Sequence, residues 1–181
     1  KSEELDRRKS MMRLFLRRQG TDESGSLSQL PPIIDSPIYL QTIRGTDFMR
    51  CSIECDDKSV IVMYMSEIGR SLLESSSAVI LDGTFKSRPR NYPQLYSIGV
   101  TLDSSFVPCC WAFLTSKRQS TYEEMFDQLD KHVSLKSDVE FALDFEQAVI
   151  SAVHVKYPDA RITLCSVHFA RSIQRYLEKN M

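Results

Sequence analysis

Two short, largely apolar segments that each lead into an aspartate are the feature that most constrains the fold of this chain. The first, residues 78–81, is wholly apolar and leads into Asp82 and Gly83, and the second, residues 139–143, is apolar except for Glu140 and leads into Asp144. Apolar runs this short are typical of strands buried inside a sheet. We therefore expect two core strands, each of which ends at a carboxylate.

The spacing of apolar residues changes between strand-like and helix-like patterns in a definite order along the chain. A hairpin-sized turn at residues 103–105 joins two of the predicted strands. A capping-box pattern at residues 120–123 begins one helix, and Tyr157 with Pro158 ends another. We expect strands at 60–65, 78–81, 95–102, 106–114, 139–143 and 161–164, and helices near 68–73, at 120–133, at 145–157 and from Val167 onward.

Three strands in a meander, followed by alternating helices and strands, are the element order of the ribonuclease-H-like fold, an α/β fold with a mixed sheet. In that fold the fourth core strand lies parallel beside the first. Asp82 and Asp144 then meet at one edge of the sheet, where open α/β sheets bind their ligands. We expect a meander and then an α-β-α-β-α series, truncated before the last helix or insertion of the domain.

Composition and charge divide the chain into three expected regions. Residues 1–20 form a basic segment, because the first 18 residues carry seven basic and three acidic side chains. Residues 21–57 form a linker and irregular lead-in, which is at first rich in Ser, Gly and Pro. A poorly patterned strand or hairpin is one interpretation of residues 42–54 within it. The core occupies residues 58–181. The 23 basic and 24 acidic side chains of the whole chain nearly cancel, and no apolar stretch has the length of a membrane span.

The two aspartates suggest a site for a divalent cation. Two neighbouring carboxylates repel each other, and a cation such as Mg²⁺ or Mn²⁺ neutralises the pair. Mg²⁺ prefers oxygen ligands and retains water, and two such ions stabilise the entering and leaving oxygens of a displacement at phosphorus. Taken singly, Asp82 is equally compatible with a turn residue before Gly83, and Asp144 with the N-cap of the next helix.

Three basic residues follow the first aspartate closely. Lys86, Arg88 and Arg90 all lie within eight residues of Asp82. A basic stretch beside a metal site is where a phosphate backbone of DNA is expected to run. A solvated loop is an equally good interpretation of the same residues.

Five short motifs follow one another in the chain: Asp82–Lys86 with Pro89, Pro93–Tyr96, Thr121 with Tyr122, Asp144–Glu146, and Cys165 with His168. In these five ordered pieces, the sequence resembles the transposase domains of Mutator-like elements (MULE), members of the DDE recombinase superfamily. The resemblance extends from about residue 60 to the end of the chain. It implies DNA cleavage and strand transfer at transposon ends, a homo-oligomer, a nuclear location, and Asp82 and Asp144 as the first two catalytic acids.

The third catalytic acid of the family is a Glu beyond the Cys-x-x-His element, and we expect this chain to end before it. Glu178 follows Asp144 by 34 positions, a spacing that other DDE enzymes use, but we interpret Glu178 as a solvated helix charge. An alternative function also stays open. A domesticated derivative would keep the fold as a DNA-binding or protein-interaction module without cleavage.

Cys165 and His168 form a further candidate metal element. Two ligands do not complete the four-coordinate site of a structural Zn²⁺. The family carries the same pair, which the resemblance suggests is a structural or DNA-end element. A buried cysteine followed by a histidine at a helix start is the alternative.

Overall fold

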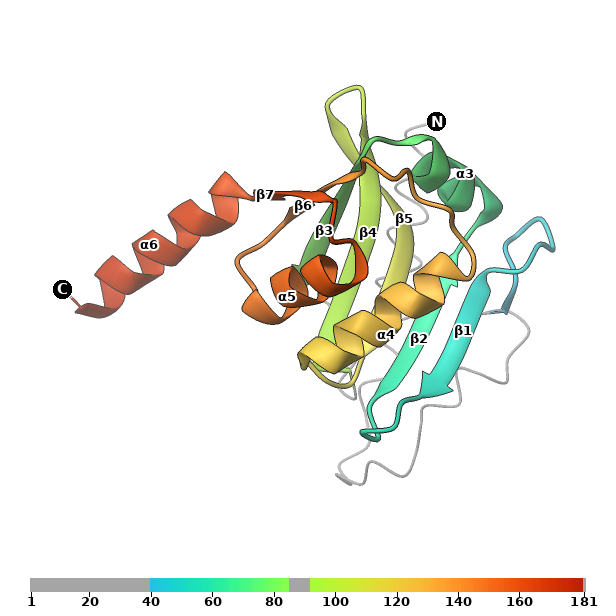
Figure 1. Cartoon of the computed structure of the whole chain (residues 1–181), viewed down its shortest axis with the longest axis horizontal. Coiled ribbons are helices and arrows are strands. Elements are labelled where there is room, and N and C mark those ends of the chain that lie inside the picture. Colours follow the sequence, from blue (N-terminus) through green and yellow to red (C-terminus); the bar gives the residue numbers. More distant parts are fainter. Residues whose placement is uncertain (1–39, 85–91, 181) are drawn as a thin grey trace.

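The computed structural model describes residues 40–84 and 92–180, and this part of the chain is built around a seven-stranded mixed sheet (Figure 1). The sheet order is β1-β2-β5-β4-β3-β6-β7. The expected basic segment and the first part of the expected linker lie outside the described residues. The strands are β1 (Met49–Glu54), β2 (Val60–Met65), β3 (Ala78–Thr84), β4 (Gln94–Leu102), β5 (Ser105–Leu114), β6 (Glu140–Leu143) and β7 (Arg161–Leu164). The helices are α3 (Glu67–Ser75), α4 (Gln119–Asp130), α5 (Gln147–Lys156) and α6 (Ser166–Asn180).

The meander consists of β3, β4 and β5, which pair in antiparallel fashion. Asp103 and Ser104 close the β4–β5 hairpin with positive φ angles of 47° and 63°. β6 returns to pair in parallel with β3, and β7 pairs in parallel with β6. Both the meander and the parallel pairing of its first strand with β6 agree with the expectation from sequence.

The first strand of the sheet lies in the expected lead-in, within residues 42–54, where the sequence suggested a poorly patterned strand or hairpin. β1 pairs with β2, and β2 pairs with β5, so both extend the meander beyond its third strand. β1 is an edge strand whose residues are half-buried except for the exposed Glu54. Apolar and polar side chains alternate along it from Met49 to Glu54, which is the pattern of a half-buried strand.

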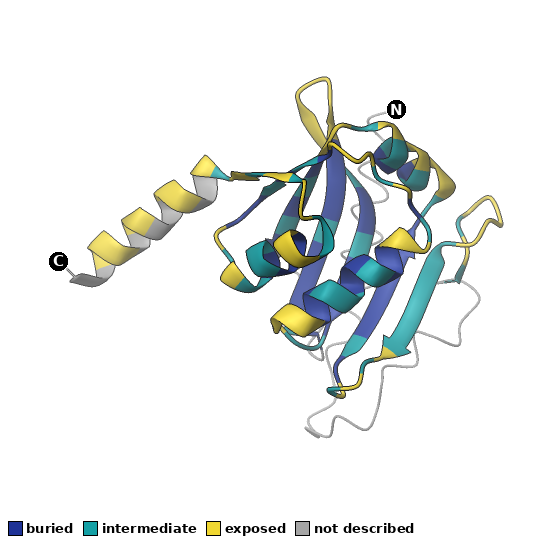
Figure 2. Cartoon of the chain, viewed as in Figure 1, coloured by how far each residue is buried: buried dark blue, intermediate teal, exposed yellow. Residues whose placement is uncertain are grey.

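Helices α4 and α5 lie together over one face of the sheet (Figure 1). The largest buried cluster joins their apolar residues to those of β3, β4 and β6, including Tyr122, Phe126 and Phe141. The central strands are accordingly the most buried part of the fold (Figure 2). A second, smaller cluster gathers around Tyr64 and Phe113.

The start of α4 differs from the predicted capping box. The N-cap is Arg118 and no side chain caps the helix, so Ser120 is already a helical residue. Glu123, the expected acid of the box, instead accepts a hydrogen bond of 2.7 Å from Nε2 of Gln119. The side chain of Gln119, one turn earlier, therefore takes the place of the backbone N–H of Ser120 as the donor to Glu123.

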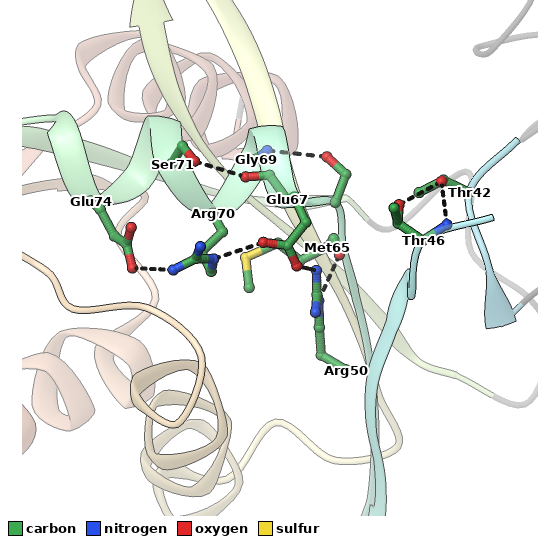
Figure 3. A network of polar contacts seen from close by, with 10 residues as sticks. Thr42, Thr46, Arg50, Met65, Glu67, Gly69, Arg70, Ser71 and Glu74 are labelled. Carbon is green, nitrogen blue, oxygen red and sulfur yellow. Dashed lines mark hydrogen bonds and ion pairs between the residues drawn. The ribbon is translucent and has the colours of Figure 1, made fainter. Parts of the chain in front are cut away.

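An arginine on β1 ties the edge hairpin to α3 (Figure 3). Nε of Arg50 donates to the carbonyl of Met65 at 2.8 Å, and its guanidinium also contacts Glu67. Arg70 bridges Glu67 and Glu74 along the same helix at 3.0 Å each. These contacts hold β1 in place at the end of the sheet that α3 covers.

Helix α6 extends away from the sheet (Figure 1). Its apolar residues Phe169, Ile173, Tyr176 and Leu177 are exposed, and the ring of Phe169 lies against that of Phe145. None of the helices in the described ranges is long and apolar enough to cross a membrane.

Candidate metal centre

The fold brings the two predicted acids to adjacent strands. β3 and β6 are in parallel register from Ala78–Glu140 to Ile80–Ala142. Continuing that register by two residues places Asp144 beside Asp82. Asp82 lies within β3 and pairs with Ser97 of β4, which excludes its interpretation as a turn residue.

Asp144 follows the last residue of β6 and is almost buried, with 9% of its surface exposed. Its Oδ1 accepts a hydrogen bond of 3.3 Å from the backbone N–H of Glu146. The N-cap of α5 is Glu146 rather than Asp144, so Asp144 organises the turn before the helix without capping it. Its Oδ2 lies 3.6 Å from the position that a Cβ on Gly83 would occupy.

A hydrogen-bonded bridge of three side chains lies next to the acid pair. Tyr122 of α4 donates to Oε1 of Glu146 at 2.8 Å. Gln94, the first residue of β4, donates from Nε2 to Oε2 of the same carboxylate at 3.2 Å. Tyr122 and Gln94 are both fully buried. Burial raises the pKa of Tyr122, and the charge of Glu146 raises it further, so the phenol keeps the proton that it donates.

Two buried polar atoms beside the bridge have no hydrogen-bond partner among the described residues, namely Oη of Tyr96 and Oε1 of Gln94. Burial raises the pKa of Tyr96 well above its ordinary value, and the negative charge of Asp144 adds to the effect, with smaller contributions from Asp82 and other neighbours. An unsatisfied buried polar atom costs about 1–3 kcal/mol. A polar ligand or hydrated ion at this point would remove that cost.

These residues fit a hard divalent cation with part of its water shell. Two carboxylates supply anionic oxygens, and the orphaned atoms of Tyr96 and Gln94 offer partners for coordinated water. Across the residues whose side chains are described, no group of three His, Cys, Asp or Glu side chains gathers as a metal site. The pair therefore provides a partial ligand set rather than a complete one.

Sequence reasoning quoted Gln94, Tyr96, Tyr122 and Glu146 as parts of motifs but gave none of them a role in the site. The sequence did contain a signal for their role, because Gln94 and Tyr96 lie four and two residues before the buried Ile98 and therefore share its face of the strand. A polar residue on the core face of a strand predicts a buried hydrogen-bond network. The partners in α4 and α5 could not be identified without the tertiary contacts.

Among the other candidates, Cys165 follows β7 on the strand next to Asp144, whereas the three basic residues lie outside the described residues. Lys86, Arg88 and Arg90 belong to the range 85–91, which the structure does not describe. Cys165 is half-buried, and its N–H donates to the carbonyl of Leu143 at 2.8 Å. The parallel register of β6 and β7 thus continues by one residue and places Cys165 beside Asp144 on the neighbouring strand.

His168 lies in α6, but the position of its side chain is not among the described features. Glu178 of the same helix is exposed and accepts a hydrogen bond of 2.8 Å from Nε2 of Gln174. This contact agrees with its interpretation as a solvated helix charge.

The strand order and the acid pair define a mixed α/β protein with a candidate divalent-cation site at the carboxyl ends of parallel strands. A model of the MULE transposase domain family matches residues 78–172, just over half of the chain. The chain therefore belongs to the MULE transposase domain family, which indicates a transposase-related function. No curated protein and no solved structure matches the chain.

Proposed function

We propose that this chain belongs to a DDE-type DNA transposase core with a ribonuclease-H-like fold. The observation that carries the proposal is the parallel pairing of β3 with β6, whose continued register sets Asp82 and Asp144 side by side on adjacent strands. The strand order β5-β4-β3-β6-β7 also supports the fold assignment. The corresponding reaction is metal-dependent DNA cleavage and strand transfer.

In this proposal Asp82 and Asp144 hold Mg²⁺ or Mn²⁺. The cation would supply charge stabilisation at the scissile phosphate. The chain contributes the geometry: β3 and β6 fix the spacing of the two acids, and the buried environment of Asp144 limits competition from bulk water. Zn²⁺ at Cys165 and His168 remains a separate proposal for a structural element.

Membership of a transposase family implies an interaction with DNA in general. We assign phosphate contacts to Lys86, Arg88 and Arg90, because they follow Asp82 directly in the chain. Action on paired transposon ends, as a homo-oligomer in the nucleus, belongs to the same proposal. The family's third acid is a Glu. Because Glu178 is engaged with Gln174 on an exposed helix, we do not assign it that role.

Metal binding is the property to measure on this chain. Calorimetric titration with MnCl₂ and MgCl₂ is carried out on the unmodified chain and on Asp82→Asn and Asp144→Asn. The proposal expects binding to the unmodified chain and its loss in both variants, because each amide removes one anionic ligand from the pair. Asparagine is close in size to aspartate, so both variants should keep the fold. Circular dichroism checks that they do.

A matched control comes from the opposite end of the same strand. Asp138 is exposed and precedes β6, so Asp138→Asn removes an equal charge far along the strand from Asp144. Binding should be unchanged in this control. Metal affinity that survives in both Asp82→Asn and Asp144→Asn, or absence of binding to the unmodified chain, would contradict the proposed site.

A further inference from the structure

The bridge centred on Glu146 joins three elements that are distant in sequence. Gln94 comes from the start of β4, Tyr122 from the first part of α4, and Glu146 from the residue before α5. Their contacts are the hydrogen bonds of 2.8 Å from Tyr122 and 3.2 Å from Gln94. Because Tyr122 and Gln94 are fully buried, they offer Glu146 a rigid anchor.

The two oxygens of Glu146 are each engaged by a protein donor. Oε1 accepts from Tyr122 and Oε2 accepts from Gln94. A carboxylate that is a metal ligand directs an oxygen at the cation, whereas this one directs both oxygens at neutral donors. The contacts therefore favour a role for Glu146 in holding the site over a role in binding the metal.

Glu146 is linked to Asp144 through the backbone. The N–H of Glu146 donates to Oδ1 of Asp144 at 3.3 Å, and Oδ2 of Asp144 stays beside Gly83 of β3. The backbone N–H of Glu146 thus binds Oδ1 of Asp144, and Oδ2 of the same carboxylate lies on the side of β3. Anchoring the Glu146 side chain limits the rotation of the Asp144 carboxylate.

We propose that Glu146 is a positioning residue, which is held by Tyr122 and Gln94 and which orients Asp144 through its backbone N–H. The orientation of Asp144 by Glu146 does not depend on the proposed function. Its expected effect on metal affinity does, because it rests on Asp144 being a metal ligand. Partners that orient a metal ligand typically change metal affinity by about 10- to 100-fold when they are removed. Tyr122 and Gln94 act on Asp144 through two successive hydrogen bonds rather than one. We therefore expect the change in metal affinity to lie near the lower end of this range.

The first test follows the orientation without any metal. Tyr122→Phe deletes only the hydroxyl that donates to Glu146. In ¹H–¹⁵N spectra of the full chain, the amide of Glu146 should shift and its hydrogen exchange should become faster, because its bond to Asp144 is loosened. Tyr157→Phe is the matched control, since the hydroxyl of Tyr157 donates to Oδ1 of Asp130 at 2.6 Å, a carboxylate that is not part of the bridge.

The second test measures Mn²⁺ affinity by calorimetry. Tyr122→Phe should weaken binding about tenfold, and Tyr157→Phe should leave it unchanged. A role in stability alone would lower the melting temperature of both variants without separating their affinities. Exchanging the bridge partners in the double variant Gln94→Glu with Glu146→Gln restores a carboxylate–amide hydrogen bond, so it should recover affinity that Glu146→Gln alone loses.

The outcomes separate this inference from the proposed function. An unchanged Glu146 amide in Tyr122→Phe overturns the positioning role. Failure of the exchanged double variant to recover Mn²⁺ affinity also overturns it, because the restored bridge should again hold the backbone of residue 146. If the unmodified chain binds no Mn²⁺, the proposed function falls, and the amide measurement still decides whether Glu146 orients Asp144.

Discussion

A Cβ atom on Gly83 would lie 3.0 Å from Nε2 of Gln94 and 3.2 Å from the ring of Tyr96. Gln94 therefore packs directly over the backbone of β3 because residue 83 has no side chain. The same amide group donates to Glu146. The glycine thus determines how closely the bridge approaches the strand that carries Asp82.

Gly83→Ala should disturb this contact without unfolding the protein. The new methyl group has to displace the end of the Gln94 side chain, which weakens its hydrogen bond to Glu146. Overpacking of this kind costs about 1–3 kcal/mol. Urea denaturation should show that loss of stability, and calorimetry should show weaker Mn²⁺ binding.

A double-mutant cycle checks the cause. If the clash with Gln94 is responsible, Gly83→Ala should cost less in a Gln94→Ala background, where the obstructing amide is gone. Equal costs in the two backgrounds would mean that the ring of Tyr96, 3.2 Å from the new Cβ, and not Gln94, resists the methyl group.

The proposed DNA contacts predict a change in salt dependence. Replacing Lys86, Arg88 and Arg90 together by alanine should reduce the slope of log K against log[salt] for duplex DNA by about 3, since each phosphate contact contributes about 0.9. Fluorescence anisotropy over a series of salt concentrations measures the slope. Affinity should fall by a similar factor for unrelated DNA sequences.

A matched triple variant removes cations that are already held in ion pairs. Lys58, Arg70 and Lys156 contact Glu54, Glu67 and Asp127, respectively. Their replacement by alanine changes the net charge equally but should leave the slope nearly as it is. Equal slopes in the two triple variants would indicate a general charge effect and contradict the local assignment.

The β4–β5 turn offers a gain in stability. Ser104 has a φ of 63°, in the left-handed region that is unfavourable for residues with a Cβ and typical of two-residue hairpin turns. Ser104→Gly removes that strain and should raise the free energy of unfolding by about 0.5–1 kcal/mol. Urea denaturation measures the change.

The neighbouring serine is the control for this turn. Ser105 is the first residue of β5 and is not among the residues with positive φ. Ser105→Gly should therefore lower the stability through the added freedom of the unfolded chain. A gain of similar size at both positions would rule out relief of backbone strain as the cause.

Burial predicts the order in which the cysteines react with an alkylating reagent. Cys109 and Cys110 are buried, and burial raises the pKa of Cys109 to about 11 and that of Cys110 further. Cys165 is half-buried at the end of β7. Because the thiolate is the reactive form, iodoacetamide at pH 8.5 should modify Cys165 at least about tenfold faster than the buried pair.

Peptide mass spectrometry over time measures these rates. In strong denaturant the three thiols should react at similar rates, which attributes the difference to the fold. Rapid modification of Cys110 in the native protein would contradict its place in the buried core.

The sequence by itself predicted the meander and the order of strands and helices from residue 60 onward. These features are local, because buried strands and amphipathic helices leave a periodic pattern in the chain. Element boundaries were predicted less well: β3 does not end at Asp82 but continues to Thr84. The start of α4 was also misplaced, because Gln119 competes for Glu123.

Only the tertiary structure decided which side chains surround the acids. Gln94, Tyr122 and Glu146 are up to 52 residues apart in sequence, yet they share one carboxylate. Nothing in the period of β4 or α4 indicates that their polar atoms point at the same residue. Such contacts depend on how the helices pack across the sheet, and the free energy of that packing comes from apolar burial that many sequences provide equally well.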